Sequence, residues 1–176
     1  MQTVADCVRP TYASDQPVCA DARRLALDRE LRDLLATVDL PSRVAPASLV
    51  EAQEAWFRRR SLCAFSERHA ACLESAYSER LAVIRAVGSA STTAPHDAQA
   101  ATCSHAPWGS SEVVFRRNGR HAATVMDTQA RVLAVASVPA RGNDWSPFVR
   151  ITTRGAAIRF TTLDGTTVDC RIRPAD

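Results

Sequence analysis

The fold is decided by the stretch from Ser48 to Tyr77, which reads SLVEAQEAWFRRRSLCAFSERHAACLESAY. In its first half a mixed set of residues recurs at helical spacing and therefore shares one helical face. The members of this face are Leu49, Ala52, Gln53, Trp56, Arg60 and Cys63. After a short break at residues 66–69 the helical pattern resumes at Cys72. The stretch therefore predicts two helices joined by a tight turn, with one cysteine on each side of it.

Another helix is predicted before this stretch, with Asp21 as its N-cap. Its apolar positions are Leu27, Leu31, Leu34, Leu35 and Val38. Pro41 ends this helix, and Ser48 with Glu51 three residues later forms a capping box for the next one. The last helix is predicted from about residue 69 to residue 87. Residues 1–20 have little periodicity and are expected to form a loop.

Several polar side chains fall on or beside the inward faces of these helices. They are Asp28, Gln53, Arg60 and Arg80, accompanied by Trp56. Buried charges need partners, so we expect an internal ion pair with hydrogen bonds that set the register of the helices. The residues of this network are predicted to be structural.

The pattern changes after residue 88. Residues 89–101, SASTTAPHDAQAA, have the composition of a linker. From residue 102 onward the period is two, with turn signals at Asn118-Gly119 and Asp164-Gly165. Six to eight short strands must close to hide their edges. The predicted fold is α+β with two domains: a disulfide-stapled three-helix domain (1–88) and, after the linker, a small antiparallel β-barrel (102–176).

Six cysteines with no C-x2–4-C pair indicate disulfides rather than zinc. Cys103 and Cys170 are expected to join the first strand to the last. The four cysteines of the helical part allow three pairings, and the sequence does not choose among them. We favour bridges from Cys7 and Cys19 to Cys63 and Cys72, in either combination, because larger loops constrain the unfolded chain more. Disulfides favour an oxidising compartment, here the periplasm or the cell surface. The chain is interpreted as a mature form with an added start methionine, and lipidation is left open.

Composition excludes several classes of function. With 46% hydrophobic and 23% charged residues the chain is globular, and it has no apolar run long enough to span a membrane. All 22 cationic residues are arginine, and residues 101–176 hold 10 of them against 6 acids. Without a basic helix or interleaved aromatics, this is not the pattern of a nucleic-acid-binding protein. No cofactor or metal is expected.

The helical part resembles the N-terminal domain of the LprI family of bacterial lysozyme inhibitors over about residues 5–88. The resemblance lies in C-x11-C (residues 7–19), A-D-x-x-x-L-x-L-D-R-E-L (20–31), E-A-Q-x-A-W-x-x-x-R-x-x-C (51–63) and C-L-x-x-A-Y-x-x-R (72–80). It implies a three-helix fold and a protein that binds a cell-wall hydrolase.

The C-terminal part resembles the membrane-bound lysozyme-inhibitor (MliC) type of β-barrel over about residues 101–174. In that family a serine and a lysine enter the lysozyme cleft and meet its carboxylates. The resemblance implies that Ser137 and Arg154 occupy these positions, with Trp145 in place of the family's aromatic. Val138-Pro139 replaces the family's glycine, so the following loop must take another shape. Arg141 is a further candidate contact in that loop.

These observations predict an inhibitor of lysozyme that blocks the acidic cleft by loop insertion. The alternative is an immunity or accessory protein for a secreted antibacterial effector such as a peptidoglycan hydrolase or lipase. An enzyme is not expected, because Ser137, His121 and Asp127 lack a G-x-S-x-G context. Cys103-Ser104-His105 lacks the second half of a metal site. The partner is predicted to be lysozyme or another secreted hydrolase, and oligomeric state is not predicted.

Overall fold

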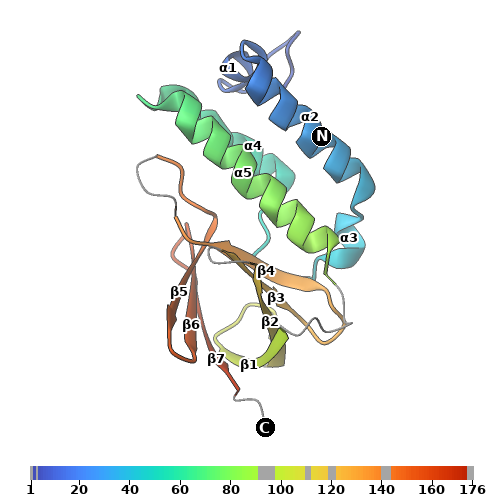
Figure 1. Cartoon of the computed structure of the whole chain (residues 1–176), viewed down its shortest axis with the longest axis vertical. Coiled ribbons are helices and arrows are strands. Elements are labelled where there is room, and N and C mark those ends of the chain that lie inside the picture. Colours follow the sequence, from blue (N-terminus) through green and yellow to red (C-terminus); the bar gives the residue numbers. More distant parts are fainter. Residues whose placement is uncertain are drawn as a thin grey trace. The chain divides into compact units, whose positions relative to one another are not determined.

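The computed structural model of the chain describes residues 2, 4–90, 98–109, 112–118, 122–139 and 144–173 (Figure 1). Within these ranges the protein is mixed α+β, with helices followed by a closed barrel of seven strands. Its contacts define two compact units. The helical unit comprises Met1–Val38, Glu51–Arg85 and Ala140–Ser146, and the barrel unit comprises Asp39–Val50, Ala86–Pro139 and Pro147–Asp176.

The helices are α1 (Asp15–Cys19), α2 (Ala22–Thr37), α3 (Leu40–Arg43), α4 (Gln53–Ser61), the 3-10 helix η1 (Leu62–Phe65) and α5 (His69–Gly88). Of these, α2 and α5 begin and end close to their predicted positions, and the short α1 and α3 were not predicted. Asp21 caps α2 as predicted, accepting a hydrogen bond from the Arg24 amide. The predicted loop before it is interrupted by α1, which the sequence pattern missed.

The predicted capping box at Ser48 is wrong. Helix α4 begins only at Gln53, and its N-cap, Ala52, offers no side-chain hydrogen bond. The Ser48 hydroxyl accepts a hydrogen bond from the Val50 amide instead. Glu51, the other half of the predicted box, is a partner of Arg59.

Aromatic rings form the centre of the helical unit. Trp56, Phe57 and Tyr77 are completely buried, and Trp56 makes edge-on contacts with the other two rings. Leu31 of α2 and Leu73 of α5 are also fully buried. Aromatic rings bury large apolar areas and favour such edge-on contacts. Of the predicted face, Gln53, Trp56 and Arg60 are buried in α4, whereas Leu49 and Ala52 precede this helix and Ala52 is exposed.

Seven strands form the barrel: β1 (Ala98–Ser104), β2 (Glu112–Asn118), β3 (Ala122–Met126), β4 (Val132–Ser137), β5 (Val149–Arg154), β6 (Ala157–Thr162) and β7 (Thr167–Ile172). Each strand pairs with the next, and β1 pairs with β7 to close the sheet. Closure removes the exposed edges of the sheet. The turn predicted at Asp164-Gly165 is present, with Gly165 at φ +90°. The predicted glycine of the other turn, Gly119, lies outside the described residues.

The barrel differs from prediction in two details. It is not wholly antiparallel, because β4 and β5 pair in parallel at Ser137 and Arg150. A parallel pair needs a crossover connection rather than a tight turn, and the long segment between these strands provides it. Strand β1 begins at Ala98, inside the predicted linker 89–101. The remaining predicted linker residues include 91–97, which lie outside the described residues.

The barrel core is filled by side chains from all seven strands, including Phe115, Leu133, Ile158 and Phe160. The connection before α4 also packs against it. Ala45 belongs to this core, and the amides of Ala45 and Leu49 donate to the carbonyls of Val132 and Leu133 at 3.0 and 2.7 Å. The barrel unit therefore includes a segment that precedes it by about fifty residues in the sequence.

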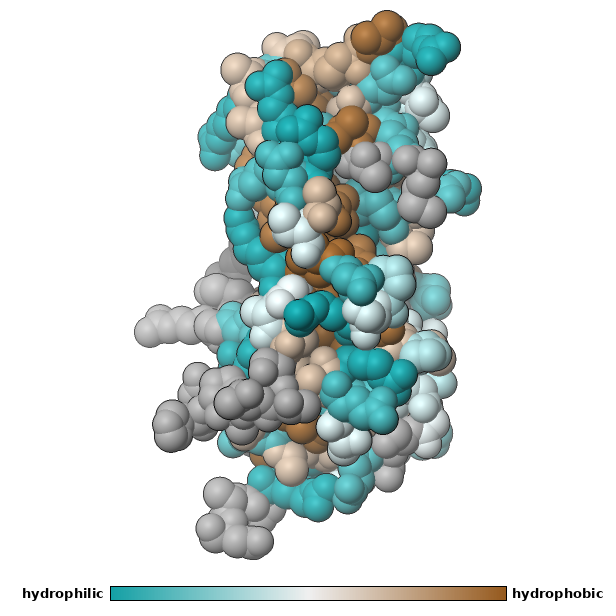
Figure 2. Space-filling model, turned by 90° about the vertical axis from the view of Figure 1, so that its right-hand side faces the viewer, coloured by the Kyte–Doolittle hydropathy of each residue, from teal (hydrophilic) through white to brown (hydrophobic). Residues whose placement is uncertain are grey.

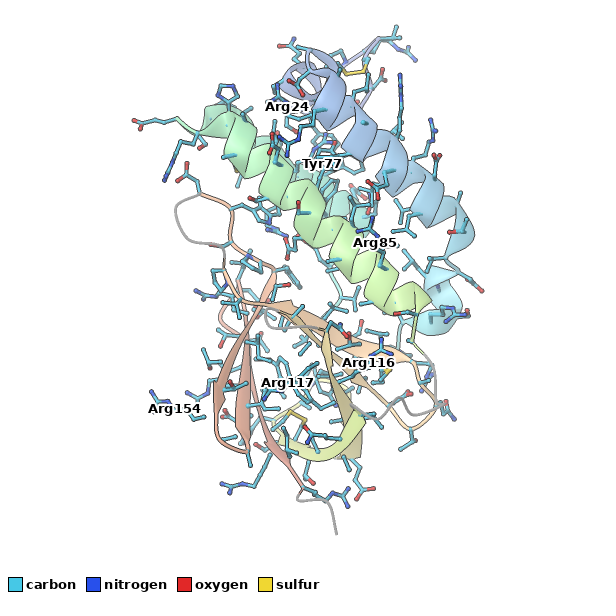
Figure 3. The ribbon with its side chains drawn as sticks, in the orientation of Figure 1. Arg24, Tyr77, Arg85, Arg116, Arg117 and Arg154 are labelled. Carbon is cyan, nitrogen blue, oxygen red and sulfur yellow. A yellow bond between two sulfur atoms is a disulfide. The ribbon has the colours of Figure 1, made fainter. Side chains whose placement is uncertain are left out.

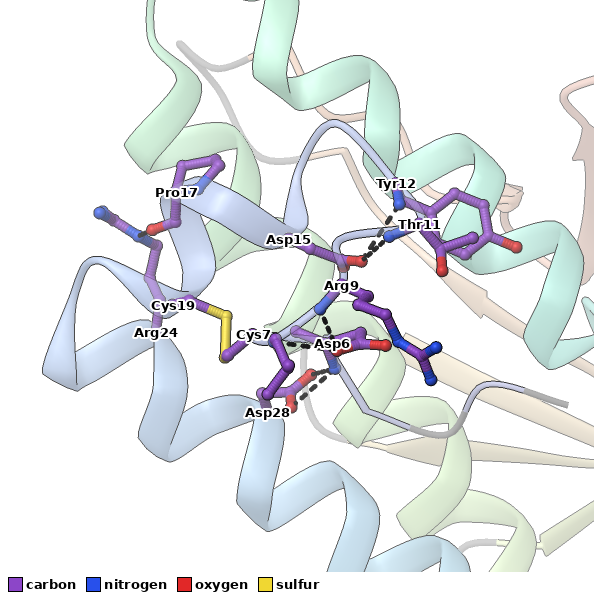
Figure 4. The surroundings of a disulfide bond; sticks show 12 residues. Asp6, Cys7, Arg9, Thr11, Tyr12, Asp15, Pro17, Cys19, Arg24 and Asp28 are labelled. Carbon is purple, nitrogen blue, oxygen red and sulfur yellow. Dashed lines mark hydrogen bonds between the residues drawn. A yellow bond between two sulfur atoms is a disulfide. The ribbon is translucent and has the colours of Figure 1, made fainter.

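The six cysteines form three disulfides, namely Cys7–Cys19, Cys63–Cys72 and Cys103–Cys170. The predicted bridge between the first and last strands is confirmed. The predicted pairing of Cys7 and Cys19 with Cys63 and Cys72 is wrong. The two helical bridges are local: one joins the segment before α1 to the last residue of α1 (Figure 4), and the other joins η1 to α5. Pairing follows proximity in the native fold, whereas loop size affects only the unfolded chain.

Figure 2 shows hydrophilic residues over much of the visible face, with smaller apolar areas between them. The large apolar side chains that are most exposed are Val8, Leu62 and Phe65. Among the described residues, no helix has the length and apolar composition needed to cross a membrane. The disulfides are consistent with a periplasmic or extracellular environment.

Candidate functional site

The candidate site is a groove of about 800 Å³ on the barrel unit. Each of four adjacent strands, β1, β7, β6 and β5, contributes three successive residues to it. In the middle row, Cys103, Cys170 and Ile158 are buried in the core, so they present mainly backbone to the groove. Thr153, the fourth member of this row, is exposed at the end of β5. Side chains alternate across a strand, so the residues before and after them face outward. The groove therefore lies on the outer surface of the sheet.

The first outward row runs across the four strands in the order Arg154, Ala157, Arg171 and Thr102. All four residues are exposed. The methyl group of Ala157 is much shorter than the side chains on either side of it. It therefore forms a low floor between two walls that each carry a guanidinium. Figure 3 shows the Arg154 side chain pointing away from the ribbon.

The second outward row contains Thr152, Arg159, Asp169 and Ser104 in register. Arg159 Nε and Nη2 donate to the two carboxylate oxygens of Asp169 at 2.7 and 3.1 Å. These hydrogen bonds lower the pKa of Asp169 and raise the pKa of Arg159. The one carboxylate that lines the groove is thus already paired.

Arg154 and Arg171 have no ion pair with any residue in the described part of the chain. The lining of the groove holds three arginines against one aspartate, so it carries an excess of positive charge. Hydroxyl groups of Thr102, Ser104 and Thr152 are the other outward polar groups. Chemically, the groove can bind an anionic group through charge-assisted hydrogen bonds.

The predicted contact residues are not all brought together. Ser137 ends β4, is partly exposed and pairs with Arg150 rather than lining the groove. Arg154 follows Arg150 by four residues, so Ser137 and Arg154 are separated by roughly 13 Å along β5. Arg141 lies outside the described residues. Of the predicted contacts, only Arg154 is placed at the groove.

Trp145, also predicted as a contact, belongs to the helical unit and is only 6% exposed. Its indole nitrogen donates to Glu79 at 2.6 Å, and the Arg59 guanidinium lies 3.8 Å from its ring centroid. Burial and a cation–π contact account for its position. Trp145 therefore has little exposed surface of its own, and its role as a contact residue stays a prediction.

A second cluster of interest lies inside the helical unit, around Arg60. This side chain is completely buried and donates to Ser14 at 3.0 Å and to the Asp15 carboxylate. It also donates to the Tyr77 hydroxyl, which in turn donates to Asp28 at 2.7 Å. Burial raises the pKa of Tyr77, so its hydroxyl stays protonated. Each nitrogen of the Arg60 guanidinium thus has an acceptor, which is the arrangement a buried charge requires.

Asp28 also connects the chain terminus to α2. Both of its carboxylate oxygens accept from the Ala5 amide, at 3.1 and 3.0 Å (Figure 4). The sequence placed Asp28 and Arg60 on inward faces, but it did not identify Ser14, Asp15 or Tyr77 as their partners. The first two lie in the segment predicted to be a featureless loop, where periodicity gives no signal.

Arg80, Gln53 and Glu51 form a neighbouring cluster. Arg80 donates to the Gln53 side-chain oxygen and to the Glu51 carbonyl, each at 2.8 Å. Burial lowers the pKa of Arg80 to about 10. Burial opposes the charge of Arg59 too, but hydrogen bonds and the charges of Glu51 and Glu79 raise its pKa. Both arginines are therefore cationic at neutral pH.

Neither buried cluster has the features of a catalytic centre. Arg60 is paired with Asp15 and Asp28, whereas Arg80 donates to a side-chain amide oxygen and a backbone carbonyl. The described part of the chain has no free cysteine that could act as a nucleophile. Among the described residues, no group of three or more His, Cys, Asp or Glu side chains is arranged to hold a metal ion. The exposed groove on the barrel is consequently the better candidate for contact with another molecule.

Comparisons of the chain with protein-family models, with curated proteins and with solved structures found no match. The groove was only partly predictable from the sequence. Arg154 was identified, whereas Arg171 and Ala157 were missed. The sequence carries a signal for Arg171, because this residue alternates with the apolar Val168, Cys170 and Ile172 and so falls on the opposite face of the strand.

Proposed function

We propose that the protein is an inhibitor of a lysozyme-type muramidase and that its barrel unit inserts Arg154 into the acidic cleft of the enzyme. The observation that supports this most directly is the position of Arg154. It ends β5, beside the two-residue turn Gly155-Ala156 that leads into β6. Its side chain is exposed and has no ion pair with any described residue. It is therefore free to bind an external carboxylate.

The turn itself favours such a projection. Gly155 has φ +59°, and Ala156 follows it at negative φ, as in a type II′ hairpin turn. A two-residue turn is narrow and leaves the last pair of the hairpin, Arg154 and Ala157, at its tip. The hairpin already orders the backbone that carries this guanidinium, so entry into a cleft costs little backbone freedom.

The chemistry of the target fits this cation. A glycosidase of this kind holds two carboxyl groups in its cleft, one of them ionised. A guanidinium can bind a carboxylate through two parallel hydrogen bonds, which are strong where water is excluded. Inhibition by occlusion needs no reactive group in the inhibitor.

The proposal extends to the division of the chain into domains and to its location. We infer a two-domain protein of the periplasm or cell surface, with an LprI-like three-helix domain and an MliC-like barrel. The local disulfides and the buried Arg60 cluster support a helical part built for stability. The exposed groove supports a barrel that makes the contact. Ser137 is retained as a secondary contact, since it is partly exposed at the end of β4.

The test is inhibition of peptidoglycan lysis by chicken-type lysozyme, measured with the full chain at stoichiometric concentration. We expect inhibition by the native protein and a loss of roughly thirtyfold in affinity for Arg154→Ala, as for a contact worth about 2 kcal/mol. The matched control is Arg58→Ala, because Arg58 is an exposed arginine on α4 paired with Glu54. This control changes net charge equally and should inhibit normally.

Two results would contradict the proposal. Equal inhibition by Arg154→Ala and the native protein would remove Arg154 from the contact. No inhibition by the native protein, tested against a panel of muramidases, would favour the alternative of a dedicated secreted effector as partner.

A further inference from the structure

We propose that the groove on β5, β6, β7 and β1 is a binding site for a phosphate group, held between Arg154 and Arg171 above Ala157. The proposal goes beyond inhibition of an enzyme, because it concerns a ligand that the barrel binds by itself. It shares Arg154 with the proposed inhibitory contact, but it depends equally on Arg171.

The register places the two arginines on opposite sides of one small residue. Arg154 pairs with Ala157 across β5 and β6, and Ala157 pairs with Arg171 across β6 and β7. Neighbouring strands lie about 4.8 Å apart, so the Cα atoms of the two arginines are separated by roughly 10 Å. Both side chains are long enough to lean over the alanine from either side. The space above its methyl group is where their guanidinium groups can meet.

The charged side chains of the groove give the space above Ala157 a net positive charge. Arg159 occupies both oxygens of Asp169, so that carboxylate is not free to neutralise a second arginine. Arg154 and Arg171 have no ion pair within the described ranges. Two uncompensated cations that approach each other above Ala157 would repel, and an anion placed between them would remove that repulsion. The Thr102 hydroxyl, paired in register with Arg171, can supply a further hydrogen bond.

The geometry favours phosphate over other anions. A carboxylate presents two oxygens along one edge, and a single guanidinium can bind both of them in a bidentate pair, as Arg159 and Asp169 illustrate. A phosphate group has oxygens on several sides and can accept from two guanidinium groups that approach from opposite directions. No aromatic residue is among those that line the groove, so stacking of bases, as in single-stranded nucleic acids, has no platform there.

The experiment is an NMR titration of the full, oxidised protein with sodium phosphate at pH 7, with sodium chloride holding the ionic strength constant. We expect saturable shifts of the amides of residues 152–159 and 169–171. Sodium acetate, the planar comparison, is expected to bind at least tenfold more weakly. Shifts that do not saturate, or that are equal for phosphate and acetate, would overturn the proposal.

Variants distinguish phosphate binding in the groove from a general effect of the protein's net charge. Arg154→Ala and Arg171→Ala should each weaken phosphate binding roughly tenfold or more, since each removes hydrogen bonds to a charged group. Ala157→Leu keeps both arginines and fills the floor between them, and it should weaken binding as well. Arg58→Ala, with the same change of net charge elsewhere, should bind like the native protein. Unaltered affinity in Arg171→Ala and Ala157→Leu would overturn the proposal.

The source of the phosphate is distinguished by further arms of the experiment. Glycerol 3-phosphate represents a free phosphate ester, and vesicles of phosphatidylglycerol in phosphatidylcholine represent a lipid surface, with pure phosphatidylcholine as the control. Binding of the ester alone supports a soluble ligand, and stronger binding to the anionic vesicles supports a lipid headgroup. Failure of every phosphate probe would refute this site and leave the lysozyme test unaffected, because no enzyme is present.

Discussion

At the scale of single residues, the helical unit is organised by the buried charge of Arg60. A cation without solvent is costly unless its hydrogen bonds are satisfied. Here Ser14, Asp15 and Tyr77 accept those bonds, and Asp28 accepts from Tyr77. The hydroxyl of Tyr77 thus joins a helix α4 cation to a helix α2 anion from its own position on α5. Removing that one oxygen takes away one hydrogen bond from a charged group on each of the two other helices.

Tyr77→Phe should therefore destabilise the protein by about 2 kcal/mol, because a hydrogen bond is lost at each of two buried charged groups. The free energy of unfolding in urea, followed by far-UV circular dichroism, measures the effect. The control is Tyr12→Phe, which makes the same chemical change on a half-buried ring that stacks on Phe57. A loss for Tyr77→Phe no larger than for the control would show that the hydroxyl does not stabilise the helices.

At the scale of secondary structure elements, the start of helix α2 is set by a hydrogen bond between residues close in the sequence, whereas the start of α4 is not. Asp21 accepts from the Arg24 amide and satisfies one of the free donors at the start of α2. The pairing of Ser48 and Glu51 looked equally good in the sequence, but the chain there packs against the barrel core through Leu49. A tertiary contact thereby overrode a local signal.

Asp21→Ala should cost about 1 kcal/mol of stability through loss of the cap. Asp33→Ala is the matched comparison, since Asp33 is an exposed aspartate within α2 whose ion pair is with the adjacent Arg32. That change should stay within about 0.5 kcal/mol of the native protein. Chemical denaturation gives the free energy of unfolding of both variants. Equal losses of stability in the two would contradict the assignment of Asp21 as the N-cap.

The turn between β6 and β7 predicts a dependence on pH. Hydrogen bonds from the Thr162 hydroxyl and the Thr166 amide lower the pKa of Asp164 below its ordinary value. The unfolded chain then binds more protons than the folded one at acid pH, so stability is present above the unfolded pKa of about 3.9 and is lost as the pH falls below it.

The midpoint of thermal unfolding should accordingly fall as the pH is lowered from about 5 toward 2. Asp164→Asn removes one of the groups that cause this, so its midpoint should be lower at neutral pH and should fall less steeply in acid. Thermal scans across this pH range provide the measurement. Identical acid slopes for the two proteins would be the contrary result.

At the scale of the whole molecule, three disulfides divide into two kinds. Cys7–Cys19 and Cys63–Cys72 join residues 12 and 9 positions apart, whereas Cys103–Cys170 spans 67 positions and joins the first and last strands of the barrel. A bridge stabilises chiefly by restricting the unfolded chain, and the restriction grows with loop length. The barrel bridge should therefore contribute most.

Replacement of both Cys103 and Cys170 by Ala should cost about 4 kcal/mol, and replacement of both Cys7 and Cys19 should cost about 3 kcal/mol. Both double variants are compared with the native protein by denaturation under oxidising conditions. A larger loss for the helical pair would mean that its native contacts, rather than loop length, determine the contribution.

Most of the secondary structure could be predicted from the sequence because its signals are local. Helical spacing identified α2 and α5, alternation identified the strands of the barrel, and Asp21 and Gly165 identified a cap and a turn. The inward positions of Arg60, Arg80 and Asp28 followed from the same periodicity. Arg154 was identified as a site residue only through a resemblance, whereas its exposure at a hairpin tip comes from the structure.

The sequence by itself determined the long helices α2 and α5 and most of the strands, and that the ends of the barrel are joined by Cys103 and Cys170. Only the tertiary structure decided the pairing of the four other cysteines, the parallel contact of β4 with β5, the burial of Trp145 and the alignment of Arg154, Ala157 and Arg171. The physical reason is distance along the chain. Periodicity and capping depend on neighbours a few residues away, whereas these features depend on which remote segments pack together.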